Sequence, residues 1–277
     1  MAAPNVTYQE LAGSGPEAIV AAIAGARRAA RRRFRTFFML TWLILVGSLV
    51  ILIASTGRVD TEFLGEWAPF ILGGVPFTIG VSVAAIIFAT MFALIGALGR
   101  LSKIAPIYAI ASLYVSLVRG TPLIVQIFFI YSALPEFGIV LPAFIAGVFA
   151  LSFNYGAYMT EIFRAGIQAI PRGQLEASAA LGMTESDTMR RIVLPQAIRI
   201  VIPAIGNEFI AMIKDSALVS FVALQELFWR ARTVGSANFQ TFSTLMLAAL
   251  VYWVLTIFFS LFQERLEKRM AEGEVRL

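Results

Sequence analysis

The chain contains no cysteine and no histidine among its 277 residues. Without cysteine there are no disulfide bonds, thiolate nucleophiles or cysteine-bound metals, and without histidine the commonest general base and metal ligand is missing. The pattern G-x-x-x-x-G-K-[ST] is also absent, so the chain has no Walker A loop to bind a nucleotide. A membrane enzyme would have only Asp, Glu, Lys, Ser and Tyr for catalysis, which disfavours an enzyme.

Charged residues are scarce as well. Only 14% of the residues are charged and 59% are hydrophobic, too few charges to cover the surface of a soluble domain of this size. The net charge of +5 does not indicate nucleic-acid binding, because the Lys and Arg residues flank hydrophobic runs as they do in membrane proteins. We therefore expect an all-α integral membrane protein that binds lipid and no nucleic acid.

Six apolar runs are predicted to be transmembrane helices. The first follows a cluster of six arginines and has no charge in twenty-one residues, which indicates a retained helix and not a cleaved signal peptide. The basic run 17–35 before it is either a cluster that sets topology or a helix lying on anionic lipid. The six predicted spans are Thr36–Thr56, Pro69–Leu98, Ile104–Pro135, Ile139–Phe163, Ile198–Val222 and Phe239–Phe262.

The second and third spans carry breaks in their helical pattern. Gly73-Gly74-Val75-Pro76 predicts an interfacial turn near the start of the second. Arg119-Gly120-Thr121-Pro122 interrupts the third, because proline lacks a backbone N–H and disfavours helix at the residue before it. A break at membrane depth is tolerated only when protein packs around it or when it lines a wet cavity.

The basic residues set the orientation of the spans. If the N-terminus is cytoplasmic, the cytoplasmic segments hold seventeen Lys or Arg and the outer segments three, with Arg119 and Lys214 in the membrane region. This asymmetry follows the positive-inside rule, although Arg230 and Arg232 weaken it in the last outer loop. We expect a multi-pass protein of the bacterial cytoplasmic membrane with both termini cytoplasmic.

Residues 171–195, here named the coupling segment, are polar and charged between two spans. Five charges lie within the sixteen residues from Glu176 to Arg191, which no membrane span tolerates. The composition predicts a helix over Gln174–Leu181 ended by Gly182, a cap at Thr184, and a second helix through Met189–Val193, with Pro195 closing the segment.

The coupling segment also fits the pattern E-A-A-(x3)-G-(x9)-I-x-L-P, and it resembles the coupling loop of permease subunits in binding-protein-dependent ABC importers. The matching positions are Glu176, Ala177, Ser178 (in place of the second alanine), Gly182, Ile192, Leu194 and Pro195. Other stretches resemble polar amino-acid permeases in the expected order: VRGTPLIVQIFFIYSALP (118–135), YMTEIFRAGIQAIPRGQLEASAALGM (158–183), LPQAIRIVIPAIGNEF (194–209) and KDSALVS (214–220).

The resemblance implies a five-helix importer core over residues 69–264 that contains the coupling segment. To this core the chain adds a basic N-terminal tail (1–35), an extra transmembrane helix (36–56) and a cytoplasmic C-terminal tail (265–277). The implied partners are ATP-binding cassette ATPase subunits, a second permease chain, an extracytoplasmic solute-binding protein and an amino-acid substrate. No cofactor is expected on this chain, and ATP with Mg is expected on the partner ATPase.

Polar residues within the spans are candidates for the substrate pathway, because a charge in hydrocarbon is costly unless it is paired or hydrated. Asp215 is predicted to accept an α-ammonium group, and Lys214 and Ser216 to meet a carboxylate or support packing. Glu161 either lines the path or pairs with Arg164 or Arg119. The remaining candidates are Tyr158, Gln126 and Thr121.

An ion-coupled secondary amino-acid transporter is the alternative function. Buried Asp215, Glu161 and Lys214 could then be proton or sodium sites. No inverted repeat is evident in the sequence, and a charged cytoplasmic segment has no obvious role in such a carrier. Copurification of an ATPase subunit would separate the two functions.

The charge pattern gives a test of topology. Reporter fusions or protease access from each side should place the N-terminus and the C-terminus in the cytoplasm. An N-terminus found outside would mean that Thr36–Thr56 does not span the membrane or is removed.

Overall fold

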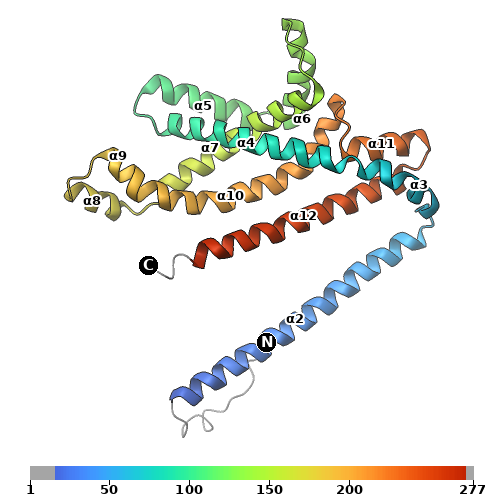
Figure 1. Cartoon of the computed structure of the whole chain (residues 1–277), viewed down its shortest axis with the longest axis horizontal. Helices are drawn as coiled ribbons and strands as arrows, with labels where there is room; N and C mark the ends of the chain where they lie inside the picture. The colour runs from blue at the N-terminus through green and yellow to red at the C-terminus, as the bar shows by residue number, and fades with distance from the viewer. Residues whose placement is uncertain (1–15, 273–277) are drawn as a thin grey trace. The chain divides into compact units, whose positions relative to one another are not determined.

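A computed structural model of the protein describes residues 16–272, and every regular element in that part of the chain is helical. Five helices are long and apolar enough to cross a membrane, and a bent helix pair gives up to six crossings. The predicted class, an all-α membrane protein, is confirmed. The contacts divide the chain into two units, residues 1–60 and 61–277, each of which is described by itself (Figure 1).

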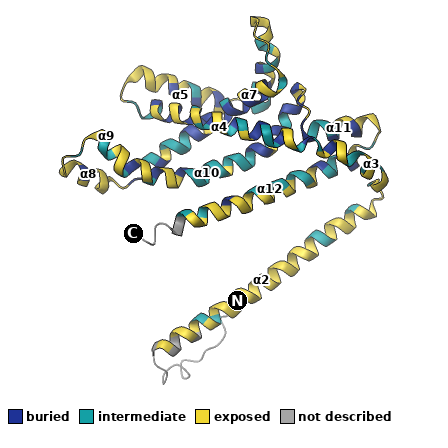
Figure 2. Ribbon diagram, in the orientation of Figure 1, coloured by how far each residue is buried: buried dark blue, intermediate teal, exposed yellow. Residues whose placement is uncertain are grey.

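The described part of the first unit contains a single helix, α2 (Pro16–Ser55). At about 1.5 Å per residue its forty residues extend about 60 Å. The run 17–35 is therefore helical and continuous with the predicted first span. Its apolar side chains, Phe37, Leu43 and Ile51 among them, are mostly exposed within this unit (Figure 2), as expected of a helix that faces lipid.

The second unit begins with α3 (Thr61–Leu72) and α4 (Val75–Leu101). The predicted turn at Gly73-Gly74 is present between them. The helical stretch begins before the predicted start of this span, since Pro69 lies inside α3. Helix α5 (Ala105–Arg119) follows, and then the break, after which α6 (Leu123–Phe128), the π-turn η1 (Phe129–Ala133) and the 3₁₀ turn η2 (Leu134–Phe137) form an arm.

The arm is bent by 105° from α5 and projects away from the neighbouring helices (Figure 1). Helix α7 (Ala143–Gln168) returns along α4. The coupling segment then contains α8 (Arg172–Ala180), α9 (Glu185–Thr188) and the π-turn η3 (Met189–Val193). The first predicted helix, Gln174–Leu181, corresponds to α8 within one or two residues, whereas the second runs on past Val193 into the next helix.

Helix α10 (Leu194–Asp215) continues directly from η3 and ends in the 3₁₀ helix η4 (Ser216–Val222). One prediction was wrong here. Pro195 does not close the coupling segment but lies in the first turn of α10, and the chain is helical on both sides of it. Lys214 and Asp215 lie in the last turn of α10, within a candidate membrane span that continues to Val222, as predicted. In Figure 1, α8 and α9 lie at one end of α10 and α11 lies near the other.

Helix α11 (Leu227–Ala237) occupies what the sequence suggested was an outer loop, and it packs against α3 and α12. The last helix, α12 (Thr241–Glu272), starts after Phe239, which has a positive φ of 57° and is outside the helix. The predicted start of the span at Phe239 was therefore wrong. Residues 265–272 are helical, although they were assigned to the C-terminal tail; residues 273–277 lie outside the described part.

The core of the second unit forms where α4 packs along α7. Small side chains at four-residue spacing, Ala85, Ala89 and Ala93, are fully buried on one face of α4. Gly156 of α7 allows close approach, because a Cβ there would lie 2.6 Å from Cβ of Phe92. Small residues bring membrane helices close enough for dense van der Waals contact, which replaces the missing hydrophobic force between helices in lipid.

A buried carboxylate, that of Glu226, joins the three helices α4, α11 and α12. Glu226 is 0% exposed and caps α11 by accepting hydrogen bonds from the backbone N–H groups of Trp229 (2.7 Å) and Phe228 (2.9 Å). It also accepts from the hydroxyls of Tyr252 on α12 (2.6 Å) and Thr78 on α4 (3.3 Å). Glu226 was not predicted from the sequence, because its burial depends on α11.

Burial raises the pKa of the Glu226 carboxyl, and the hydrogen bonds from Tyr252, the two backbone amides and Thr78 oppose that rise only in part. A raised folded-state pKa means that the folded protein binds the proton more tightly than the unfolded chain. The stabilising contribution is thus fully present below the unfolded pKa and is lost as the pH rises through the raised value.

Replacing Glu226 tests this junction. Glu226→Ala should destabilise the protein by about 2–4 kcal/mol, because a helix cap is lost and buried donors are left without an acceptor. Glu226→Gln keeps one acceptor and the volume and should cost less, and the advantage of the wild type over it should shrink as the pH rises. Thermal unfolding in detergent measures both. Glu62→Ala on the exposed face of α3 is the control; equal effects of Glu226→Ala and the control would contradict the assignment.

Candidate functional site

The helix break between α5 and α6 is stabilised by side-chain hydrogen bonds. The Gln126 amide donates to the backbone carbonyl of Val118 (2.8 Å) and to the carbonyl and hydroxyl of Thr121 (3.1 and 2.8 Å). Thr121 donates in turn to the carbonyl of Leu117 (3.0 Å), and Asn154 of α7 donates to the Gln126 side-chain oxygen (3.2 Å). The carbonyls released by the break thus have partners, as membrane depth requires.

A cavity of about 450 Å³ lies beside the break, a volume within the usual range for small-molecule sites. It is bounded by the break, α7 and the second half of α10. Its lining residues are Arg119, Gly120, Thr121, Pro122, Leu123, Asn154, Tyr155, Tyr158, Glu208 and Asp215.

Three charged groups line this cavity. Asp215 accepts a hydrogen bond of 2.7 Å from the hydroxyl of Tyr155. Glu208 is partly buried and lies on the same face of α10 as Asp215, because a spacing of seven residues is close to two helical turns. The Arg119 guanidinium lies 5.1 Å from the centre of the Tyr158 ring, a cation–π arrangement. The cavity therefore presents one guanidinium and two carboxyl groups beside an aromatic ring.

The structure brings some of the predicted pathway residues together and separates others. Asp215, Tyr158 and Thr121 line the cavity. Gln126 does not line it but donates a hydrogen bond to Thr121, which does. Ser216 is buried and donates to the carbonyl of Ile213 (2.7 Å), and Lys214 is exposed; neither lines the cavity. The reason is helical geometry, because consecutive residues at the end of α10 point in different directions.

Sequence reasoning did not assign Arg119 or Glu208 to the pathway. Both are ionisable residues within the predicted spans, but neither was among the pathway candidates. One signal was present: Glu208 and Asp215 are seven residues apart, which places two carboxylates on one face of α10.

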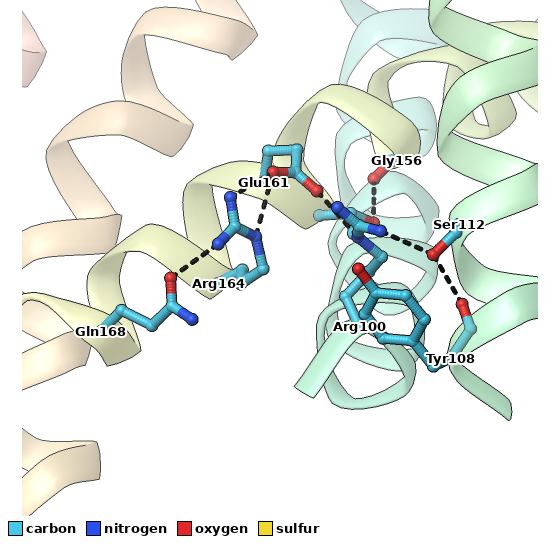
Figure 3. A network of polar contacts seen from close by, with 8 residues as sticks. Arg100, Tyr108, Ser112, Gly156, Glu161, Arg164 and Gln168 are labelled. Carbon is cyan, nitrogen blue, oxygen red and sulfur yellow. Dashed lines mark hydrogen bonds and ion pairs between the residues drawn. The ribbon is translucent and has the colours of Figure 1, made fainter. Parts of the chain in front are cut away.

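Glu161 belongs to a second polar cluster, drawn in Figure 3. One of its oxygens accepts from Arg164 at 2.6 and 3.0 Å, and the other from Arg100 of α4 at 3.3 Å. Arg100 also donates to Ser112 of α5 (2.6 Å). The pairing with Arg164 is one of those considered from the sequence, and the pairing with Arg119 does not occur. The cluster ties α4, α5 and α7 together and engages both oxygens of Glu161.

The coupling segment forms a braced helical projection. Gly182 has a φ of +71°, a conformation that favours glycine, as expected after a helix. Thr184 caps α9 by accepting from the Asp187 N–H (3.1 Å). Buried Ser178 accepts from Thr188 (3.0 Å), so the two short helices are joined, and Gln196 of α10 donates to Gln174 of α8 (2.6 Å).

The matched residues of the coupling segment divide into exposed and packed groups. Glu176, Ala177 and Gly182 are exposed, as are Leu194 and Pro195, whereas Ser178 is buried and Ile192 is half-buried. Leu181, between them, is 81% exposed. The projection thus offers both an apolar and a charged surface to another molecule.

Residues 89–272 match the model of the family described as binding-protein-dependent transport system inner membrane component. The chain belongs to this family. The match includes the break, the cavity and the coupling segment and leaves out α2 and α3. As a family member, the chain is a multi-pass membrane component of a transport system.

Curated relatives extend the family match. The chain is 42% identical over 203 residues to the L-cystine transport system permease protein TcyB of Bacillus subtilis (strain 168), covering 73% of this chain and 87% of that protein. It is 37% identical to the arginine transport system permease protein ArtQ of the same organism, covering 74% and 94%.

Solved structures agree with the fold. The crystal structure of an amino acid ABC transporter with histidines is 41% identical and superimposes with a TM-score of 0.73, covering 76% of this chain and 99% of that chain. An inward-facing structure of the MetNI methionine ABC transporter is 19% identical with a TM-score of 0.61, covering 73% and 96%; at this identity it supports the fold alone.

Proposed function

We propose that the chain is the transmembrane permease subunit of an ATP-driven importer of polar amino acids, and that the cavity beside the helix break holds the solute during transport. The observation that carries this proposal is the cavity itself, where Asp215, Glu208 and Arg119 face one space beside a broken membrane helix. A guanidinium can bind an α-carboxylate and a carboxylate can bind an α-ammonium, so both ends of an amino acid find partners.

The relatives support the class of solute, since those compared are permeases for cystine or arginine and a component of an amino acid ABC transporter. Membership of a binding-protein-dependent family favours this importer over an ion-coupled secondary transporter. In the proposal an extracytoplasmic binding protein delivers the solute, a second permease chain completes the path, and both chain ends lie on the cytoplasmic side of the bacterial membrane.

The energy source is proposed to be a separate ATPase that docks on the coupling segment. The absence of a Walker A loop in the sequence fits this division, with ATP and Mg²⁺ used by the partner and no cofactor held by this chain. The exposed charge of Glu176 and the exposed Leu181 supply polar and apolar contacts for a groove. Since α10 runs from η3 to the cavity, a displacement of the projection would move Glu208 and Asp215.

Glu176→Lys should leave the chain in the membrane but release the ATPase, because it reverses an exposed charge on the projection without touching a span. Gly182→Asp should act in the same direction, since an L-residue at this positive φ is strained. Membrane insertion, ATPase retention and amino-acid uptake are measured on one preparation. The control is Glu62→Lys on α3, which should retain the ATPase; normal uptake with Glu176→Lys would refute the docking site.

Asp215→Asn should preserve the fold, because asparagine can still accept from Tyr155, but reduce uptake. A lost charge-assisted hydrogen bond of ~1.5–3 kcal/mol corresponds to roughly ten- to a hundred-fold in affinity. Uptake into vesicles is measured beside ATPase stimulation by the loaded binding protein. Persistent stimulation with collapsed uptake supports a role in the path, whereas failure to assemble would make Asp215 structural and contradict the proposal.

A further inference from the structure

Helix α2 carries a cluster of arginines outside the part of the chain that matches the family, which begins at residue 89. No acidic residue occurs between Glu17 and Asp60, so the cluster has no carboxylate nearby on its own helix. None of the ion pairs found in residues 16–272 includes one of these arginines. All six side chains are exposed within this unit: Arg27, Arg28, Arg31, Arg32, Arg33 and Arg35.

Helical geometry gathers these arginines on one side of α2. Successive residues are rotated by about 100°, so all but Arg33 fall within an arc of about 140°. Phe38 and Trp42 continue along the same side, with their ring centroids 6.2 Å apart. We name this surface the arginine stripe; its residues are Arg27, Arg28, Arg31, Arg32, Arg35, Phe38 and Trp42. One side of one helix thus has a basic half followed by an aromatic half.

The length of α2 places the basic half of the stripe at the level of the lipid headgroups. The helix is continuous over forty residues, about 60 Å, whereas the hydrocarbon core is about 30 Å thick. The part from Thr36 to Ser55 has no charge and is about 30 Å long, so it fills the core. Arg35 then lies at the edge of the hydrocarbon and Arg27 about 12 Å further out, and their long side chains reach the phosphates.

The one-sided arrangement separates lipid binding from a role in topology alone. A cluster that only orients a span needs positive charges close to it, on any side of the helix. The arginine stripe instead matches the two parts of a phospholipid. Guanidinium groups pair with phosphate in a bidentate manner, and aromatic rings below them can lie along an acyl chain. The ammonium group of a zwitterionic lipid would oppose this binding, so the stripe favours a lipid with net negative charge.

We propose that the arginine stripe is a binding site for anionic phospholipid. Arg31 and Arg35 bind the headgroup, because they lie near the middle of the arc and closest to the hydrocarbon. Phe38 and Trp42 contact an acyl chain of the same lipid. The extra helix therefore brings anionic lipid to the chain, a role that does not depend on the transport function proposed above.

The test measures lipid preference beside the stripe in the assembled transporter. The chain has no cysteine, so a fluorophore is attached at Leu45→Cys, an exposed position seven residues after Phe38 on the same side of α2. The transporter is reconstituted into phosphatidylcholine vesicles in which a fixed fraction of the lipid has brominated chains, either as phosphatidylglycerol or as phosphatidylcholine. Bromine quenches a fluorophore close to it, so the two quenching levels give the relative association of the two lipids at the stripe.

The parent protein with Leu45→Cys should prefer phosphatidylglycerol by at least about tenfold. Arg31→Gln should lower this preference about fivefold, the usual effect of one arginine near an anionic surface. Arg33→Gln is the matched control, because Arg33 lies at the same depth on the other side of α2. It should change the preference by less than about twofold, and protease access should show that both variants insert as the parent does.

Equal quenching by the two lipids in the parent, the result if a protein or a nucleic acid covers the stripe, would overturn the inference. An equal loss of preference in Arg31→Gln and Arg33→Gln would also overturn it, because the number of charges and not their side would then decide. If Arg31→Gln does not insert, the preference of the parent is measured at rising NaCl concentration. Loss of the preference supports the arginine stripe, since salt screens charge pairing, and a preference unaffected by salt contradicts it.

Discussion

The rest of the site depends on one constraint: a helix can stop inside a membrane only where other groups replace its backbone hydrogen bonds. At Gly120-Thr121-Pro122 that replacement comes from Gln126, which reaches back to the carbonyls of Val118 and Thr121. Asn154 on α7 in turn fixes Gln126. The polar groups that make the break possible thus also fix its position against α7, and the cavity forms where the broken helix turns away by 105°.

The same helices connect the cavity with the coupling segment. Helix α7 carries Tyr155 and Tyr158 at the cavity, and Glu161 and Arg164 one or two turns further along the chain. The Arg100–Glu161–Arg164 cluster joins α7 to α4 and α5 in this region. These ion pairs are partly buried, and removing one partner would leave an uncompensated charge, so they oppose sliding of the helices. A movement at α8 would then reach the cavity through α7 and α10 together.

Much of the fold could be predicted because membrane helices leave strong sequence signals. Long apolar runs predicted the spans, and Pro122 predicted the break. Gly182 and Thr184 predicted where the short helices end and begin. Helix α11 could not be predicted, because its composition is mixed and its stability comes from packing and from the buried Glu226. Thr121 could be predicted as a cavity residue from the break alone. The rest of the cavity lining depends on which residues of α7 and α10 face the break. That arrangement favours Glu208 over Lys214 and Ser216, and only the three-dimensional packing specifies it.

The absence of native cysteine permits a direct test of the central claim, that solute occupies the cavity beside the break. A single cysteine at Thr121, compared with one at the exposed apolar Leu113 of α5, can be labelled with a membrane-impermeant thiol reagent in the assembled transporter. We predict that Thr121→Cys is labelled, that transported amino acid slows its labelling, and that Leu113→Cys is not labelled. Labelling of Thr121→Cys that is unaffected by amino acid, or no labelling in any state of the ATPase cycle, would contradict the claim.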